Sequence, residues 1–129
     1  MNRVPESYRS LAIDRQLGSL AASLARIASC ARKPARDAAV IPMLEECMWF
    51  IEWTAPLAEV EIGGHLAELQ LMLSLWRSVW REAMVSRAQR ALLAYQTKLW
   101  SDQVLDRSGL RPWPAAATTA RAVDSAPPR

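Results

Sequence analysis

The chain has 129 residues, of which 51% are hydrophobic and 22% charged, and its net charge is +3. This composition predicts one globular domain with a hydrophobic core and excludes the disordered and fibrous classes. Charged residues recur so often that no apolar run reaches the ~20 residues of a membrane-spanning helix. The sequence therefore predicts no membrane span.

Charge is divided into three blocks along the chain. Residues 1–36 carry seven basic and two acidic side chains, residues 37–76 carry seven acidic ones and no Lys or Arg, and residues 77–109 carry six basic and three acidic ones. We expect the acidic middle block to pair with its basic neighbours within the fold, each exposed pair contributing ~0–1 kcal/mol. This internal complement argues against nucleic acid as a partner.

The first predicted helix covers residues 6–32. Its apolar positions repeat at alternating spacings of four and three, which is typical of a helix packed against another helix. Small residues such as Gly18 and Ala21 flank these positions, so a neighbouring helix can approach closely. Lys33-Pro34 predicts the end of the helix, because the residue before proline avoids the α conformation. The apolar positions are Ile13, Leu17, Leu20, Leu24, Ile27 and Ala31.

The second predicted helix covers residues 38–53, with Asp37 as a possible cap and Pro42 acceptable only near its first turn. One side of this helix is apolar, and Trp49 and Trp53 lie on nearly the opposite side, beside glutamates. We expect a short helical turn at 56–62, and then a break at Gly63-Gly64, because consecutive glycines lose much backbone entropy in a helix. The apolar side consists of Val40, Leu44, Cys47, Met48 and Ile51.

The third predicted helix is long and covers residues 65–107, since the chain from His65 to Ser108 contains neither Gly nor Pro. Such a helix would extend roughly 65 Å, about twice what the core of one such domain needs. Its length predicts that a second copy of the chain completes the bundle. The apolar stripe turns to a new direction after Ser86, which predicts a kink, a supercoil or a change of partner between Arg81 and Ser86. The stripe comprises Leu66, Leu69, Leu73, Trp76, Trp80 and Met84, followed by Ala88, Ala91, Leu92, Tyr95 and Leu99.

The last segment, residues 110–129, is rich in Pro, Ala, Thr and Ser. Such a composition buries too little apolar surface to offset the entropy of ordering, which predicts a disordered tail after a helical domain at 1–109.

No motif for catalysis, metal binding or cofactor binding is present, so we assign no catalytic, metal or cofactor residue. His65 is the sole histidine and has no second ligand at metal-binding spacing. Cys30 and Cys47 are expected to be reduced and packed as small hydrophobic residues, which favours the cytoplasm, although a disulfide between them stays open.

The tryptophans are the strongest indication of function. Trp76 and Trp80 lie on the apolar stripe and are expected in the core. Trp49 and Trp53 form either a second buried layer or a protein-binding surface, and Trp100, which also lies off its local apolar face, is assigned to the same surface.

The sequence thus predicts an all-α small helical bundle with one long C-terminal helix, completed by dimerisation. The expected function is that of a non-enzymatic protein-interaction module, an adaptor, assembly or regulatory factor, that forms a cytoplasmic homodimer and binds an unknown protein through Trp49, Trp53 and Trp100. One alternative is a carrier of an apolar or pigment cofactor. Another alternative is a weak nucleic-acid-binding protein. The carrier's pocket would be lined by Met72, Trp76, Trp80 and Met84.

Overall fold

The computed structural model describes residues 12–108 and shows an all-α bundle in that range, as predicted. The predicted tail at 110–129 and the first residues of the first predicted helix lie outside the described residues. Within the range there are four α-helices, two short 3₁₀ helices and no strand. They are α2 (Ile13–Ala31), η1 (Pro34–Arg36), α3 (Asp37–Thr54), η2 (Ala55–Leu57), α4 (Val60–Ala83) and α5 (Arg87–Ser108).

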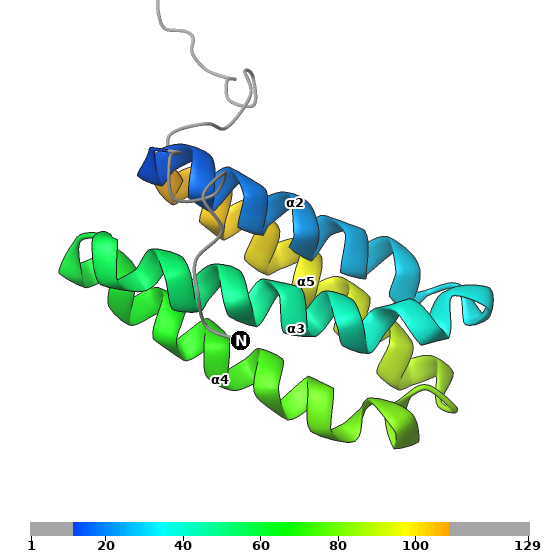
Figure 1. Cartoon of the computed structure of the whole chain (residues 1–129). Coiled ribbons are helices and arrows are strands. Elements are labelled where there is room, and N and C mark those ends of the chain that lie inside the picture. The colour runs from blue at the N-terminus through cyan, green and yellow to red at the C-terminus, as the bar shows by residue number, and fades with distance from the viewer. Residues whose placement is uncertain (1–11, 109–129) are drawn as a thin grey trace, which may run out of the picture.

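Consecutive helices run antiparallel, and α3 packs between α2 and α4 (Figure 1). The most extensive helix pair is α2 with α5, whereas α4 and α5 have little contact although they follow each other in sequence. The predicted apolar side of α2 is confirmed, because Leu17, Leu20, Leu24 and Ile27 are all buried. The apolar sides of α3 and α4 are also confirmed, so one core joins the helices. Its members on α3 and α4 include Val40, Leu44, Cys47, Ile51, Leu66, Leu69, Leu73, Trp76 and Trp80.

The single helix predicted at 65–107 is wrong. The chain leaves α4 after Ala83, turns through 84–86 and returns as α5 (Figure 1). Ser86 causes the new start: its Oγ accepts a hydrogen bond from the backbone N–H of Gln89 (3.2 Å), and its carbonyl accepts one from the N–H of Arg90 (3.0 Å). A serine in this position satisfies N–H groups that the first turn of a helix leaves open. A helix can therefore end without Gly or Pro.

The hairpin removes one reason for expecting a second chain. The dimer is predicted from the length of one continuous helix over 65–107. In the structure α4 has 24 residues and α5 has 22, and helices of these lengths fit within a single bundle. Self-association therefore has to be inferred from the side chains that the bundle exposes on its surface.

The predicted break at Gly63-Gly64 is also wrong, because α4 begins at Val60 and continues through both glycines. A Cβ added at Gly63 would lie 3.3 Å from the carbonyl oxygen of Ala55, whereas at Gly64 it would meet nothing within 4 Å. Gly63 thus lets the start of α4 approach the backbone of η2 closely. The helix predicted at 38–53 is confirmed as α3, but Pro42 lies inside α3 rather than in its first turn.

Helix α5 presents the opposite face from the one predicted. The expected apolar positions Leu92, Tyr95 and Leu99 are exposed. The buried face contains Leu93, Ala94, Thr97, Ser101, Val104 and Ser108. These side chains are mostly small, and the Ser101 hydroxyl donates a hydrogen bond to the carbonyl of Ala21 on α2 (2.8 Å). The close approach predicted for the small residues of α2 is therefore confirmed at Ala21, with α5 as the neighbour, whereas Ala22 and Ala25 are exposed.

The predicted internal pairing of charge is confirmed by three ion pairs. Each joins an acidic residue of α3 to a basic residue of a different neighbouring helix. The pairs are Glu46 with Arg26 of α2 (3.5 Å), Glu45 with Arg77 of α4 (2.9 Å), and Asp37 with Arg90 of α5 (2.5 Å). Only the last is largely shielded from solvent, so it is the one whose loss should matter most for stability.

Candidate functional site

The structure brings Trp49 and Trp53 together on α3. Their rings are stacked with centroids 6.1 Å apart and planes inclined by 22°, and Phe50 meets Trp53 edge to face at 5.9 Å. All three side chains are partly exposed. The spacing of four residues places both indoles on one side of the helix, where they form a rigid aromatic surface.

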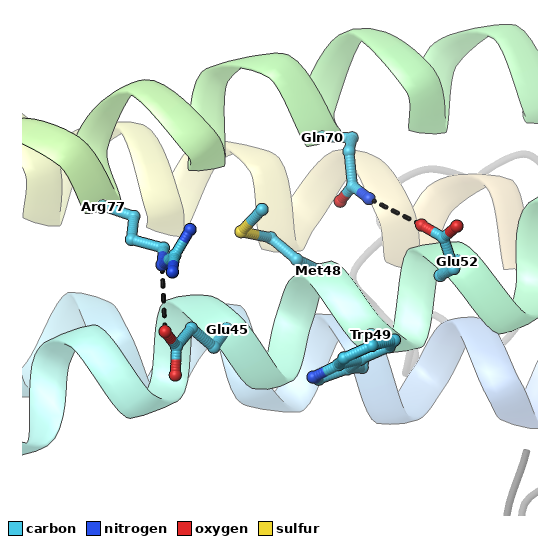
Figure 2. A pocket seen from close by; sticks show the side chains of 6 residues that line it. All are labelled: Glu45, Met48, Trp49, Glu52, Gln70 and Arg77. Carbon is cyan, nitrogen blue, oxygen red and sulfur yellow. Dashed lines mark hydrogen bonds and ion pairs between the residues drawn. The ribbon is translucent and has the colours of Figure 1, made fainter. Parts of the chain in front are cut away.

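A shallow pocket of about 210 Å³ lies between α3 and α4 beside this pair (Figure 2). Two polar bridges cross it, from Arg77 Nε to Glu45 (2.9 Å) and from Gln70 Nε2 to Glu52 (3.2 Å). The side chain of Met48 lies between the two bridges, and Trp49 lies at the outer side of α3. The pocket thus combines a flexible apolar side chain with groups that can accept or donate hydrogen bonds.

The electrostatics of this region are acidic. Glu52 accepts a hydrogen bond from the amide of Gln70, which is neutral and does not balance the charge of the carboxylate. The other amide atom, Gln70 Oε1, is buried without a hydrogen-bond partner among the described residues. Glu59, the residue before α4, is exposed, and the structure describes no ion pair for it. A partner that brings cations or N–H donors fits this rim better than an anion does.

Trp100 does not join the aromatic pair. It belongs to α5 and packs, partly exposed, against the core, and it takes no part in the ring stack of Trp49 and Trp53 or in the lining of the pocket beside them. Trp76 and Trp80 are buried, as predicted. The described structure therefore supports Trp49 and Trp53 as one surface and separates Trp100 from it.

The residues proposed for a cofactor pocket are not brought together. Met72 and Trp76 line a groove between α4 and α5, whereas Trp80 and Met84 line a different pocket near the start of α3. The four residues are thus divided between two separate pockets.

The thiols and the histidine are not placed for joint chemistry. Cys30 lies near the end of α2 and His65 near the start of α4, which are opposite ends of the bundle (Figure 1). Both cysteines are free thiols, and burial raises the pKa of Cys47 to about 12, with Glu46 adding to the effect and Arg26 opposing it. Within residues 12–108, no three His, Cys, Asp or Glu side chains are grouped to hold a metal ion, and no helix is apolar and long enough to cross a membrane.

Three of the basic residues of the predicted long helix form ion pairs within the described residues, whereas Arg81 and Arg87 are exposed without one. Arg77 and Arg90 pair with acidic residues of α3, and Lys98 pairs with Asp102 one turn further along α5 (2.9 Å).

A second surface, which the sequence did not indicate, lies on α4 and α5. Six large apolar side chains there are 40–65% exposed, more than any of the tryptophans described above. Three of them, Leu75, Val79 and Leu92, line the groove that contains Met72 and Trp76. The exposed residues are Leu71, Leu75, Val79, Leu92, Tyr95 and Leu99. The spacings of Leu71 and Leu75 were a possible signal, because these leucines lie off the buried stripe of α4.

No known protein family, curated protein or solved structure matches this chain. We therefore infer its function from the two surfaces described above.

Proposed function

We propose that the protein is a non-enzymatic helical module that binds another protein through the aromatic surface formed by Trp49, Phe50 and Trp53. The observation that carries the proposal is the partly exposed stack of Trp49 on Trp53, beside a pocket between two helices. Aromatic residues held rigidly in this way lose little conformational entropy on binding, which is why they dominate the energetics of many interfaces.

The charge around the aromatic surface indicates the chemistry of the partner. Glu52 lies next to Trp53 at the end of α3, Glu59 is the residue before α4, and both are exposed without an ion pair within the described residues. An apolar segment flanked by Lys or Arg would place its apolar side chains on the indoles and its cations among these carboxylates. Electrostatic steering of this kind mainly raises the association rate and falls with salt.

The proposal can be tested with the double variant Trp49→Ser/Trp53→Ser. The tagged protein, purified under cross-linking from its native source, should retain a partner that mass spectrometry identifies, and the purified partner should bind the variant at least about tenfold more weakly, a loss of ~1.4 kcal/mol. Val85→Ser is the matched control, because Val85 is 84% exposed in the turn before α5, away from the indoles.

A second variant protects the test against loss of folding. Glu52→Lys/Glu59→Lys changes only exposed side chains outside the helical turns of α4, so its helicity should stay close to that of the original chain, and its affinity for a basic partner should fall. Equal affinity of both variants and the original chain would contradict the proposal. So would a large loss of helicity in the tryptophan variant together with unchanged binding by the lysine variant, because the indoles would then be part of the core.

A further inference from the structure

We propose that the exposed apolar face of α4 and α5 is the surface on which a second copy of this chain docks. This inference rests on the proposed function, a protein-interaction module, and specifies how the module pairs with itself. The face, called the α4–α5 face below, consists of Leu71, Leu75 and Val79 on α4 and of Leu92, Tyr95 and Leu99 on α5.

The first support is the orientation of α5. This helix turns Thr97, Ser101 and Ser108 toward α2, while Leu92, Tyr95 and Leu99, which are larger and more apolar, face solvent. Burial of apolar surface is the main favourable term in folding, so a lone bundle would gain by burying the larger side chains. The observed orientation is consistent with a surface that another chain covers.

The second support is the groove between the two helices. It has a volume of about 330 Å³ and is lined mainly by apolar side chains, including Leu75, Val79 and Leu92. Trp76 also lines the groove, and its indole N–H already donates a hydrogen bond to Gln96 Oε1 (2.7 Å). Apart from Gln89 and Gln96, the groove therefore offers mainly apolar contacts, which suits an occupant with apolar side chains.

The third support is the area of the face. A fully covered Tyr buries about 150–250 Å², and the free energy of burying a Leu or Val corresponds to roughly 60–120 Å². The exposed fractions of the six residues therefore amount to on the order of 300–400 Å². A stable interface buries about 800 Å² per partner, with an apolar centre and a polar rim. The α4–α5 face is the right size for such a centre.

The pattern of the face suits a second copy in particular. The apolar residues follow helical spacing on both helices, at i, i+4 and i+8 on α4 and at i, i+3 and i+7 on α5. Two copies placed face to face would form a four-helix layer in which each helix gains a neighbour on its open side. The centre of the face carries no charge, so two identical faces can meet there without repulsion.

The charges at the ends of the face make a distinguishing prediction. Glu68 and Glu82 lie on the same side of α4 as its exposed leucines, at either end of the apolar run. Two copies would bring acidic rims near each other, so their association should become tighter as salt screens the repulsion. A basic partner on the same face would bind more weakly as salt rises.

Sedimentation equilibrium of the full chain and of Leu75→Glu/Leu92→Glu tests the inference. We expect the original chain to dimerise at concentrations up to about 100 µM and the variant to associate at least about 100-fold more weakly, because each buried carboxylate would lack a partner. Both positions are about half exposed in a single copy, so the helicity of the variant should not change. Leu57→Glu/Val60→Glu is the matched control, since these residues are 60% and 93% exposed but lie outside the face.

A mixture of Leu75→Glu/Leu92→Glu with Leu75→Lys/Leu92→Lys adds a test of direct contact. If two copies meet through this face, the mixture should form dimers that neither variant forms alone. A monomeric original chain would overturn the inference, and so would a dimer that persists in the glutamate variant or dissociates in the control. A monomer that binds another protein or its own residues 109–129 on this face would assign the face to that occupant instead. None of these results would affect the tryptophan test, which uses a different surface.

Discussion

Arg90 on α5 donates a hydrogen bond from Nη2 to the carboxylate of Asp37, the first residue of α3, at 2.5 Å. The same guanidinium donates from Nε to the carbonyl of Met84 (2.6 Å) and from Nη1 to the carbonyl of Ala31 (3.3 Å), and it lies 5.6 Å from the ring centre of Trp80. One side chain thus joins the ends of α2 and α4 to the starts of α3 and α5. A planar group with several donors is suited to this task, and Lys could not replace it.

Replacing Arg90 by Met should lower the free energy of unfolding by about 2–4 kcal/mol, because the Asp37 carboxylate and two carbonyls would lose a donor in a largely shielded place. Urea denaturation followed by circular dichroism measures the change. Arg87→Met at the exposed start of α5 is the control and should change stability by less than about 0.5 kcal/mol. Equal effects of the two substitutions would show that the guanidinium of Arg90 does not hold the helix ends together.

The turn between α4 and α5 should depend on Ser86. Its Oγ accepts the N–H of Gln89, so Ser86→Ala should cost about 1 kcal/mol and Ser86→Gly only a few tenths. Ser74→Ala, at an exposed position inside α4, should be neutral or slightly stabilising because alanine favours the helix. Thermal and urea unfolding of the three variants check this order, and an Ala variant as stable as the original chain would contradict the capping role.

The Ser86 turn also shows where the sequence was sufficient and where it was not. The change in direction of the apolar stripe placed a discontinuity between Arg81 and Ser86, and the chain does turn there. The motif Ser86-x-x-Gln89 is a helix-start signal that could have identified a new helix. The absence of Gly and Pro does not ensure a continuous helix, because a serine cap and the Arg90 contacts can end one helix and start another.

The functional surfaces were predicted less well, for a physical reason. Periodicity identifies an apolar face but not whether the face turns inward. On α2 the apolar face is buried, whereas on α5 the small residues around Ser101 pack against α2 and leave Tyr95 exposed. Close helix packing decided this orientation, and only the three-dimensional arrangement reveals it. The pairing of Trp49 with Trp53 could be predicted from their spacing of four, whereas the separation of Trp100 from them could not.

The two adjacent glycines of α4 should respond differently to alanine. Gly64→Ala should raise the free energy of unfolding by about 0.5–1 kcal/mol. Alanine lowers the conformational entropy of the unfolded chain, and the added Cβ meets open space in the folded one. Gly63→Ala should gain less or lose stability, because its Cβ would press on the Ala55 carbonyl at 3.3 Å. The melting temperatures of the two variants test this contrast, and a larger gain at Gly63 would show that η2 does not pack closely on α4.

The stability of the fold at high pH should depend on Cys47. Burial raises the pKa of this thiol from 9.0 to about 12 in the folded chain, so between these values the unfolded thiol loses its proton and the folded one keeps it. The unfolded state then binds fewer protons, and the free energy of unfolding falls as pH rises, by up to about 1–1.5 kcal/mol per pH unit from this group. Below pH 9 the contribution of the protonated thiol is fully present.

Cys47→Ala should therefore lose less stability than the original chain between pH 8.5 and 10.5, as measured by urea denaturation at each pH, because all other titrating groups are common to both proteins. Thiol labelling gives an independent check. The partly exposed Cys30 should react with a disulfide reagent in the folded protein, whereas Cys47 should react only as fast as the chain opens. Parallel pH profiles for the two proteins, or equal labelling of the two thiols, would show that Cys47 is accessible to water.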